Sequence, residues 1–244
     1  MTRGRRPISG MYALVTCEHA GNRVPALYRP LFRAHEDLLL SHRGHDPGAR
    51  LLARELAAAL DAPIVVSTVS RLIIDLNRSP AHPSLYSEVT RLLPLSARRE
   101  ILQRYYLPYR ARVETWIAGR IDRGGRVLHL SAHSFTPVLN GKVRNADVGL
   151  LYDPRRPAEA VFCRRWQRAM HSLAADIRVR RNYPYTGRSD GLTTWLRRRF
   201  PAESYLGIEL EVNQRYPLGG DAAWRELRAL LIEGLRRSMA DTPD

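Results

Sequence analysis

Two histidines stand where short β-rich runs of the sequence end. His19 follows the run 11–16, and His133 follows the run 126–132. In open α/β sheets, ligands bind beyond the carboxyl ends of the strands, so both imidazoles are expected at one edge of a sheet. A hydrolytic zinc site takes three protein ligands, typically histidine and carboxylate, and keeps one position open for water. The two histidines fit two of these places, although a single histidine at a strand end is more often structural.

The residues just before the next predicted helix offer a third ligand. His42, His45 and Asp46 lie close together in the sequence, and any of the three could bind a metal. Asp46 also has a structural interpretation, because Asp followed by Pro is typical of an N-cap and first helical residue. The residue types alone therefore leave the third ligand open.

A metal-activated water also needs a carboxylate that accepts its proton and returns it to the leaving amine. Glu209 and Glu211 lie two residues apart in the apolar run 205–212, so both point to the same face if this run is a strand. Acids in a buried strand are unfavourable unless they are paired or functional. Salt bridges to arginine are the structural alternative, and they explain one such acid more easily than two.

Arginines and polar side chains near the other predicted strand ends are suited to substrate recognition. Arg78 closes the run 70–78, and a guanidinium can bind a carboxylate through two hydrogen bonds or polarise a carbonyl oxygen. The polar loop 180–191 precedes a predicted helix, with a charged surface turn as the alternative interpretation. The predicted substrate-binding residues are Arg71, Asn77, Ser134, Arg181, Asn182, Tyr185 and Asp190.

The elements that must position these residues alternate between strand and helix. Strands are predicted at 11–16, 63–69, 72–76, 126–132, 147–152, 177–180 and 205–212. Helices are predicted at 46–60, 97–121 with a kink at Pro108, 158–175, 191–199 and 221–239. This alternation predicts an α/β fold with a mostly parallel or mixed sheet and helices on both faces. We expect a single catalytic domain over 1–244 with a flexible basic N-terminus at 1–10. The stretch 79–95 is expected to be a lid over the site or a disordered loop.

The net charge of +15 comes almost entirely from arginine, with Lys142 the only lysine. The arginines are spread along the whole chain, which is more typical of a coding bias than of a phosphate-binding stripe. No helix-turn-helix, zinc-finger, RRM or KH motif is visible, so no specific nucleic-acid partner is expected. Weak binding to nucleic acid at low salt follows from charge alone.

The remaining composition is that of a cytoplasmic protein. No apolar run approaches the roughly 20 residues that cross a bilayer, and the apolar stretch after the basic N-terminus is too short for a signal peptide. Cys17 and Cys163 show neither metal-binding spacing nor a disulfide pattern, so we expect free thiols. The oligomeric state is not determined by these patterns.

Seven segments taken in order resemble the N-formylglutamate amidohydrolase family, which is similar in fold to the zinc carboxypeptidases (a phosphorylase/hydrolase-like architecture). They are CEHAGNRVP (17–25), HDPGA (45–49), SRLIIDLNRSP (70–80), AHSFTP (132–137), VGLLYDP (148–154), RRNYPYTGRSDGLTTWLR (180–197) and GIELEVNQ (207–214). The resemblance implies a mononuclear zinc hydrolase with a water nucleophile. It implies that His19 and His133 bind zinc and that Glu211 is the general base. Arg78 resembles the arginine that binds the substrate carboxylate or carbonyl.

The sequence departs from the related patterns at the third ligand. The carboxypeptidase pattern has Glu three residues after the first His, and Asn22 stands at that position here. Asp46 is the preferred substitute, with Asn22 and Glu18 as alternatives. The motifs CEHAG and AHSFTP also differ from those of family members that act in histidine degradation. The zinc chemistry is therefore expected to transfer better than the substrate.

These observations predict a Zn²⁺-dependent amidohydrolase, although His and carboxylate ligands accept other divalent metals as well. His19, Asp46 and His133 would bind the metal. Glu211 would activate water and Arg78 would orient the substrate, a small N-acyl amino acid such as N-formylglutamate. One alternative is a zinc carboxypeptidase or deacylase that acts on peptides or cell-wall fragments. Another is a basic nucleic-acid-binding protein that keeps the fold without catalysis.

Overall fold

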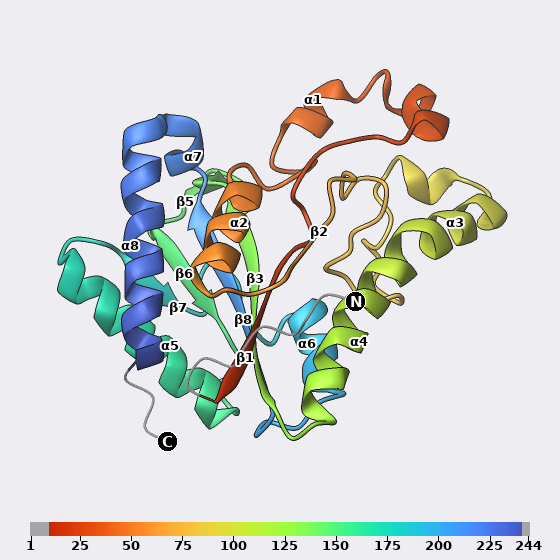
Figure 1. The fold of residues 1–244 in the computed structure, drawn as a ribbon. Helices are drawn as coiled ribbons and strands as arrows, with labels where there is room; N and C mark the ends of the chain where they lie inside the picture. Colours follow the sequence, from red (N-terminus) through yellow and green to blue (C-terminus); the bar gives the residue numbers. More distant parts are fainter. Residues whose placement is uncertain (1–9, 241–244) are drawn as a thin grey trace.

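A computed structural model of the protein describes residues 10–240, so nearly all of the predicted flexible N-terminus lies outside the described residues. A twisted sheet lies between two groups of helices (Figure 1). Its strands are β1 (Met11–Cys17), β2 (Ile64–Val66), β3 (Arg126–Phe135), β6 (Val148–Leu151), β7 (Val179–Arg181) and β8 (Tyr205–Asn213). The strand order is β2-β1-β3-β8-β6-β7. The predicted α/β fold with a mostly parallel, mixed sheet is confirmed.

The directions of the strands bring three chain segments to one edge of the sheet. β1 pairs in parallel with β2 and β3, and β3 pairs in parallel with β8. β6 runs antiparallel to β8 and parallel to β7. In register, Thr16 lies beside Ser131, and Ser131 lies beside Glu209. The residues that follow these three positions therefore meet at the same end of the sheet.

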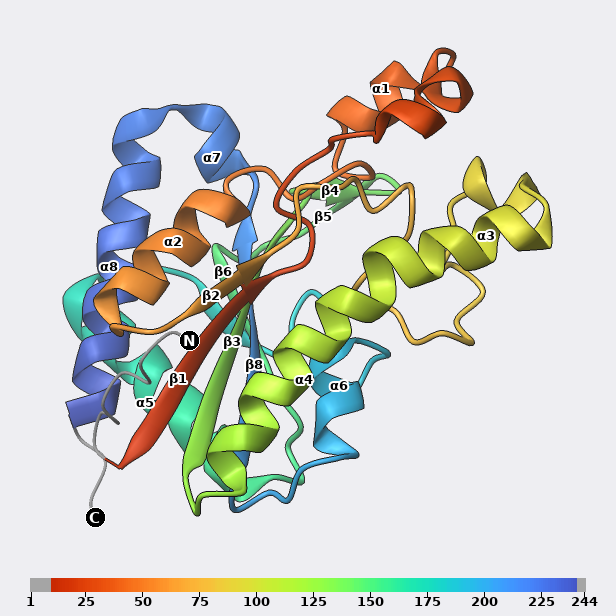
Figure 2. The same cartoon turned by 45° about the vertical axis from the view of Figure 1, so that its right-hand side comes forward.

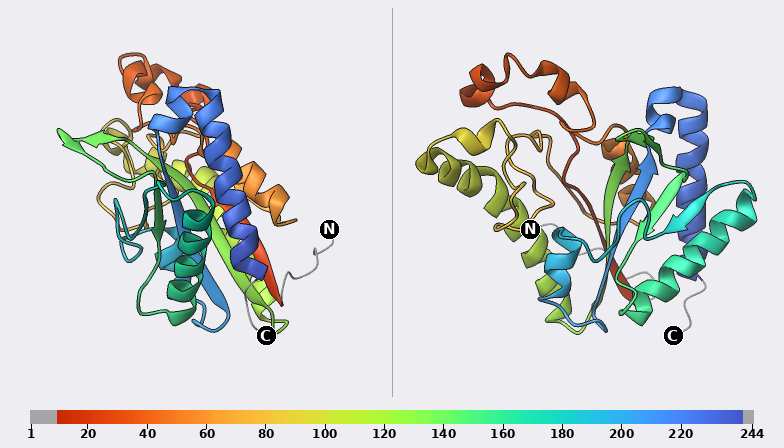
Figure 3. Two further views of the ribbon diagram at one scale, coloured as in Figure 1. Left: turned by 90° about the vertical axis from the view of Figure 1, so that its left-hand side faces the viewer. Right: turned by 180° about the vertical axis from the view of Figure 1, so that it is seen from behind.

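Each face of the sheet is covered by its own group of helices. On one side lie α2 (Ala49–Ala59), α5 (Pro157–Leu173) and α8 (Asp221–Ala240), and on the other lie α3 (Leu95–Ile101), α4 (Leu107–Ile121) and α6 (Leu192–Arg197) (Figures 1 and 3). The covering helices have apolar residues at helical spacing, as at Phe162, Trp166 and Met170 of α5, which are all buried. Two hydrophobic clusters result, one on each side of the sheet.

Several short elements were not predicted. They are the 3₁₀-helices η1 (Ala26–Phe32) and η2 (Thr90–Leu92), the helices α1 (Glu36–Leu40) and α7 (Arg215–Gly219), and the hairpin of β4 (Val138–Leu139) and β5 (Lys142–Val143). The segment that carries α1 lies beyond the end of the sheet (Figure 2). Their short length explains the omission, because none of them is long enough to show a periodic pattern.

The long helix predicted at 97–121 is confirmed, and its irregularity lies close to Pro108. The helical run begins at Leu95 and includes a π-helical segment, η3 (Leu102–Tyr106), immediately before α4. Proline has no N–H to donate and its ring crowds the preceding turn, and the widened turn before Pro108 accommodates both effects.

The strand predicted at 72–76 is wrong. These residues form turns, in which the N–H of Ile73 donates to Ser70 O and the N–H of Asp75 donates to Leu85 O. Leu72, Ile73, Ile74 and Leu76 are buried in the hydrophobic cluster on the α4 side. The apolar run thus reflects packing between the loop and the helices, and it forms no ladder with the sheet.

Two further expectations concern the cysteines and the absence of a membrane-spanning segment. Cys17 and Cys163 are free and buried. None of the helices within residues 10–240 combines the length and apolarity needed to cross a bilayer.

Candidate metal and active site

Strands β3 and β8 place polar side chains on the face of the sheet that α4 covers. Leu128, Leu130 and Ala132 of β3 belong to the cluster on the α2 side. Since successive side chains of a strand point to opposite faces, His129, Ser131 and His133 point toward α4. By the same alternation Glu209 and Glu211 of β8 lie on this face, as predicted from their spacing. Both line one cavity.

Two imidazoles and one carboxylate converge at the carboxyl ends of β1 and β3. Asp46 Oδ2 lies 2.8 Å from His133 Nδ1 and 3.3 Å from His19 Nδ1. The three side chains are buried, and their candidate ligand atoms all lie within 4.8 Å of one another.

The second nitrogen of each imidazole contacts a further carboxylate. His19 Nε2 lies 2.7 Å from Asp75 Oδ1, and His133 Nε2 lies 3.1 Å from Glu18 Oε2. Glu18 is itself held by the hydroxyls of Ser131 and Tyr109, which donate to its two oxygens over 2.5 and 2.7 Å. Metal-binding histidines typically donate their free N–H to such a carboxylate, which fixes the ring and the tautomer.

The charges of this cluster stabilise one another. Burial opposes ionisation of Asp46, but the positive charge and hydrogen bonds of His19 and His133 hold the pKa of Asp46 well below its usual range. Burial alone would lower the pKa of His133, yet its hydrogen bonds to Asp46 and Glu18 raise that pKa well above the usual value. Both pKa shifts keep this group of buried side chains charged.

The donor set fits a divalent metal ion. Both Nδ1 atoms face one oxygen of Asp46, and both Nε2 atoms have carboxylate acceptors. The carboxylates beside Nε2 can hold an N–H on that atom of each ring, so a metal ion would take the place of a proton at Nδ1. Two histidines and one carboxylate are the ligands of many catalytic zinc sites.

Asp46 reaches this position because it lies before α2 and not on it. Its N–H donates to His19 O over 3.0 Å, while α2 begins only at Ala49 after Gly48. The interpretation of Asp46 as the N-cap and Pro47 as the first helical residue is therefore wrong. Gly48 adopts φ +78°, and a Cβ there would lie 2.5 Å from Pro217 Cβ, so the turn into α2 requires glycine.

Glu211 is the acid in this site with an unpaired oxygen. Among the contacts of the described residues, its buried Oε2 has no hydrogen-bond partner. Burial, together with the neighbouring charges of Asp46 and Glu209, raises the pKa of Glu211 to about 8 against the opposing effect of His133. Gly149 on the adjacent strand allows this packing, since a Cβ there would lie 2.0 Å from Tyr183 O and 3.2 Å from Glu211 Cβ. A carboxyl group in this state is suited to exchange protons with a bound molecule.

Glu209 differs from Glu211 in its contacts. Its Oε1 accepts a hydrogen bond from the hydroxyl of Thr193 over 2.6 Å. This bond ties β8 to α6, so the contact of Glu209 links two elements beside the cavity.

A cavity of about 200 Å³ lies against the cluster. Arg71 on its wall contacts Asp75 at 2.7 Å and Asp46 at 3.5 Å, so this guanidinium braces two of the carboxylates around His19. Arg78 donates to Asp190 O over 3.0 Å, and its Nε lies 4.0 Å from Asp75. Arg78 therefore keeps more of its donors for a ligand than Arg71 does.

The structure brings most of the predicted substrate-binding residues together. The cavity is lined by Arg71, Asn77, Ser134, Tyr185 and Asp190 from that prediction, and by Arg78 as well. Arg181 and Asn182 are not among the lining residues. Asn182 Oδ1 accepts the N–H groups of Tyr152 and Gly187, which shapes the turn of the loop, and Arg181 is exposed with Nη1 3.5 Å from Tyr152 OH.

The other candidates for the third ligand lie elsewhere. Asn22 donates its side-chain N–H to Leu39 O over 3.1 Å, and Glu18 lies behind His133, on the Nε2 side of the ring. His42 lines the cavity, whereas His45 does not. Within residues 10–240, the group that could hold a metal consists of His19, Asp46 and His133.

Sequence reasoning missed how some neighbours support the cluster. Asp75 was visible as an acid in the segment 70–78, but its contact with His19 depends on a loop that was taken for a strand. Ser131 carried a weak signal through its period-two spacing from His133. The contact of Tyr109 with Glu18 crosses from α4 to β1 and has no local signal.

Comparisons with known proteins show the family and the fold of this chain. The sequence profile of the N-formylglutamate amidohydrolase family matches residues 11–217. A solved structure of a gene product from Agrobacterium tumefaciens is 31% identical with a TM-score of 0.78, over 93% of this chain and 90% of that one. The N-formylglutamate amidohydrolase from Ralstonia eutropha is 18% identical with a TM-score of 0.66, over 94% of this chain and 93% of that one, a similarity that shows the fold. The comparison with curated protein sequences found no match.

Proposed function

Since this chain belongs to the N-formylglutamate amidohydrolase family, whose members act on carbon–nitrogen bonds other than peptide bonds, we propose that it is a zinc-dependent hydrolase of small N-acyl amino acids. N-formylglutamate is the first candidate substrate. The observation that carries the proposal is Glu211, a buried carboxyl group with a free oxygen that lines the same cavity as His19, Asp46 and His133.

His19, Asp46 and His133 are the residues that would hold the metal. When bound, zinc supplies a Lewis acid that polarises the amide carbonyl and makes a water molecule more acidic. Asp75 and Glu18 hold the two rings from behind, so their orientation is set before any ligand binds. Such preorganisation contributes to catalysis because the groups need not reorient during the reaction.

Glu211 is the proposed general base and general acid. Its Oε2 accepts a proton from the attacking water and then donates this proton to the nitrogen of the leaving amine. Burial raises the pKa of Glu211, so its surroundings favour the protonated form. A divalent cation near Glu211 would favour the ionised form that accepts a proton.

Arg78 is the proposed contact for the substrate carboxylate. Within residues 10–240 its guanidinium donates one hydrogen bond, to the carbonyl oxygen of Asp190, so its other N–H groups can form the paired hydrogen bonds that carboxylates favour. Arg71 is proposed as a positioning residue because Asp75 and Asp46 already engage it. The cavity of about 200 Å³ is smaller than the roughly 300–1,000 Å³ of sites for drug-sized ligands, which favours a small reacting unit.

The first test is the metal content of the purified protein. We expect about one zinc ion per chain in the wild type and almost none in His133→Ala. The matched control is His171→Ala, an exposed histidine on α5 whose loss should leave the metal in place. Hydrolysis of N-formyl amino acids should stop on chelation and return when zinc is added. Hydrolysis that proceeds equally well with a chelator, by a protein that binds no metal, would contradict the proposal.

A further inference from the structure

A second hollow adjoins the catalytic cavity. It has a volume of about 520 Å³, and three of its lining residues, His42, Arg71 and Tyr185, also line the catalytic cavity. We call this hollow the side groove. Since the two spaces share these side chains, they lie side by side.

The walls of the side groove are held by hydrogen bonds. One wall comes from the segment 79–95, where Ser87 Oγ donates to Leu72 O over 2.6 Å and Tyr86 OH donates to Arg98 O over 2.7 Å. Leu139 of the β4–β5 hairpin contributes an apolar side chain. The stretch predicted as a lid or a disordered loop is therefore tied to the body of the protein and shapes a surface beside the active site.

Two exposed arginines, Arg43 and Arg91, line the part of the side groove outside the catalytic cavity. Of the two acids there, Asp75 is already engaged by Arg71 and His19, which leaves Glu88 beside the arginines. Arg43 Nη2 lies 2.7 Å from Glu88 Oε1, and the charges of Arg43 and Arg91 both lower the pKa of Glu88. Two guanidinium groups thus share one carboxylate. Arg91 is exposed to solvent, so it can bind an incoming anion without first breaking a buried contact.

We propose that the side groove binds an extension of the substrate that ends in a carboxylate. The reacting acyl-amino acid unit then occupies the catalytic cavity, its continuation passes Tyr185 and Arg71, and the terminal carboxylate reaches Arg91 and Arg43. This inference rests on the proposed function. In this arrangement most contacts that recognise the substrate lie in the side groove, which is larger than the catalytic cavity. The substrate is therefore longer than a formylated amino acid. The extension is attached either to the amine side, as in an N-formyl peptide, or to the acyl side, as in an N-acyl amino acid with a dicarboxylic acyl group.

Three substrates separate these arrangements. N-formylglutamate fills only the catalytic cavity, N-formylglutamyl-alanyl-glutamate extends on the amine side, and N-glutarylglutamate extends on the acyl side. We expect kcat/KM for one of the extended compounds to exceed that of N-formylglutamate by about tenfold or more, which corresponds to roughly 1.4 kcal/mol of added binding.

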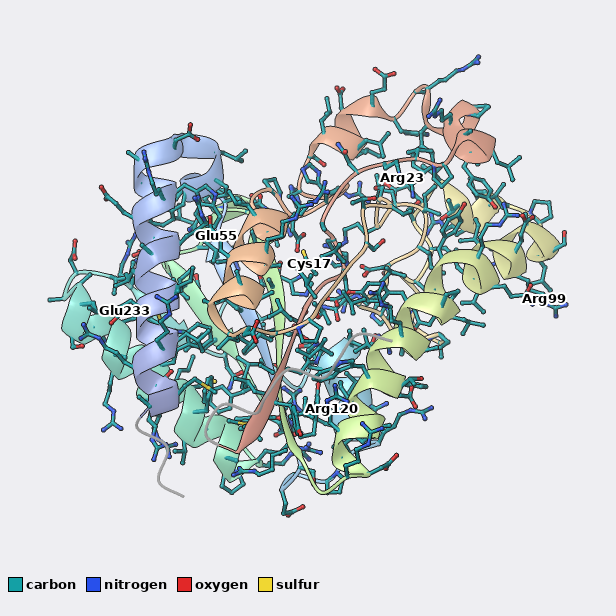
Figure 4. The ribbon with its side chains drawn as sticks, in the orientation of Figure 1. Cys17, Arg23, Glu55, Arg99, Arg120 and Glu233 are labelled. Atoms are coloured by element: carbon teal, nitrogen blue, oxygen red, sulfur yellow. The ribbon has the colours of Figure 1, made fainter. Side chains whose placement is uncertain are left out.

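Two variants of the side groove test its role. Arg91→Glu reverses the charge, and Leu139→Trp fills space at a residue that does not line the catalytic cavity. Each should lower kcat/KM for the preferred extended substrate about tenfold and change N-formylglutamate hydrolysis less than about twofold. Arg99→Glu is the matched control, since Arg99 is an exposed arginine of α3 outside both spaces (Figure 4).

Calorimetric titration of the Glu211→Gln protein with the same three compounds measures binding without turnover. Tighter binding of an extended compound that Arg91→Glu removes supports the side groove even if the wild type hydrolyses none of them, a result that would count only against the proposed function. Equal affinity and equal kcat/KM for short and extended compounds, unchanged by both variants, would overturn the inference.

Discussion

His129 and His133 lie on the same face of β3 and are both buried, yet their surroundings favour opposite charge states. His129 lies between two hydroxyls, with Nε2 2.9 Å from Thr16 Oγ1 and Nδ1 2.7 Å from Tyr205 OH. Burial lowers the pKa of His129 to about 4, against the opposing charge of Glu18. His133 lies between Asp46 and Glu18, whose hydrogen bonds raise its pKa.

The difference shows that burial alone does not make a histidine a candidate metal ligand. Both rings are removed from water, but only His133 is surrounded by the carboxylates that collect where β1 and β3 end. Further down the strand, the hydrogen-bond partners of His129 are two neutral hydroxyls. The sheet thus has a structural half and a chemical half, and the boundary falls within four residues of one strand.

The largest effect on catalysis is expected from a substitution of Glu211, which lines the cavity. Glu211→Gln keeps the shape of the side chain but removes its ability to accept a proton. We expect kcat to fall by about 10²–10⁴-fold, the usual contribution of a general base, with zinc content unchanged. Steady-state kinetics and elemental analysis measure both quantities. Glu203→Gln, at an exposed position, is the control, and a Glu211→Gln enzyme with full activity would remove Glu211 from the mechanism.

The low pKa of His129 should make the free energy of unfolding depend on pH in the acid range. The unfolded-state pKa of histidine is about 6.5, and that of His129 in the folded protein is about 4. Between these values the unfolded chain binds more protons, so the contribution of His129 to the free energy of unfolding decreases as the pH falls from about 6.5 to about 4. Relative to His129→Gln, the wild type should lose about 3 kcal/mol between pH 7 and pH 4.

Urea denaturation of both proteins at a series of pH values measures this difference. Comparing the two proteins cancels the titration of carboxylates and of His133, which both proteins share. A difference in stability that does not change with pH would mean that His129 titrates normally, and the contrast between the two histidines would then fail.

A smaller effect is expected from a substitution of Glu18, whose carboxylate contacts Nε2 of His133. Glu18→Gln weakens the acceptor of His133 Nε2, and the loss of such a partner typically reduces metal affinity roughly 10–100-fold. Competition with a chromophoric chelator measures the affinity. Thr16→Val removes a comparable partner from His129 and should leave zinc affinity unchanged. Equal losses in both variants would indicate a general destabilisation of the strand.

The smallest effect is expected from His129→Gln on catalysis. Gln keeps a polar amide group beside Thr16 and Tyr205, and His129 does not line the cavity. We expect kcat/KM to stay within about twofold of the wild type, a difference of roughly 0.4 kcal/mol or less. A loss of activity without loss of zinc would assign His129 to the chemical half and redraw the boundary on β3.

Much of the fold could be predicted because it depends on local patterns. The alternation in β3 and β8 and the helical spacing in α5 follow from periods of two and 3.6 residues, and the structure confirms these elements. The strand prediction for 72–76 failed because an apolar stretch indicates burial without specifying which element it packs against. Asp46 remained ambiguous for a related reason, because the pair Asp46-Pro47 is compatible both with a helix cap and with a metal ligand.

The sequence by itself determined which chemical groups are available and that His19, His133 and Glu211 stand near strand ends. Only the tertiary structure decided that Asp46 lies between the two Nδ1 atoms, that Asp75 and Glu18 lie behind the rings, and that Glu211 keeps an unpaired oxygen. The reason is physical. Local periodicity sets the face on which a side chain lies, whereas protonation and hydrogen bonding depend on distances between segments that are far apart in the chain.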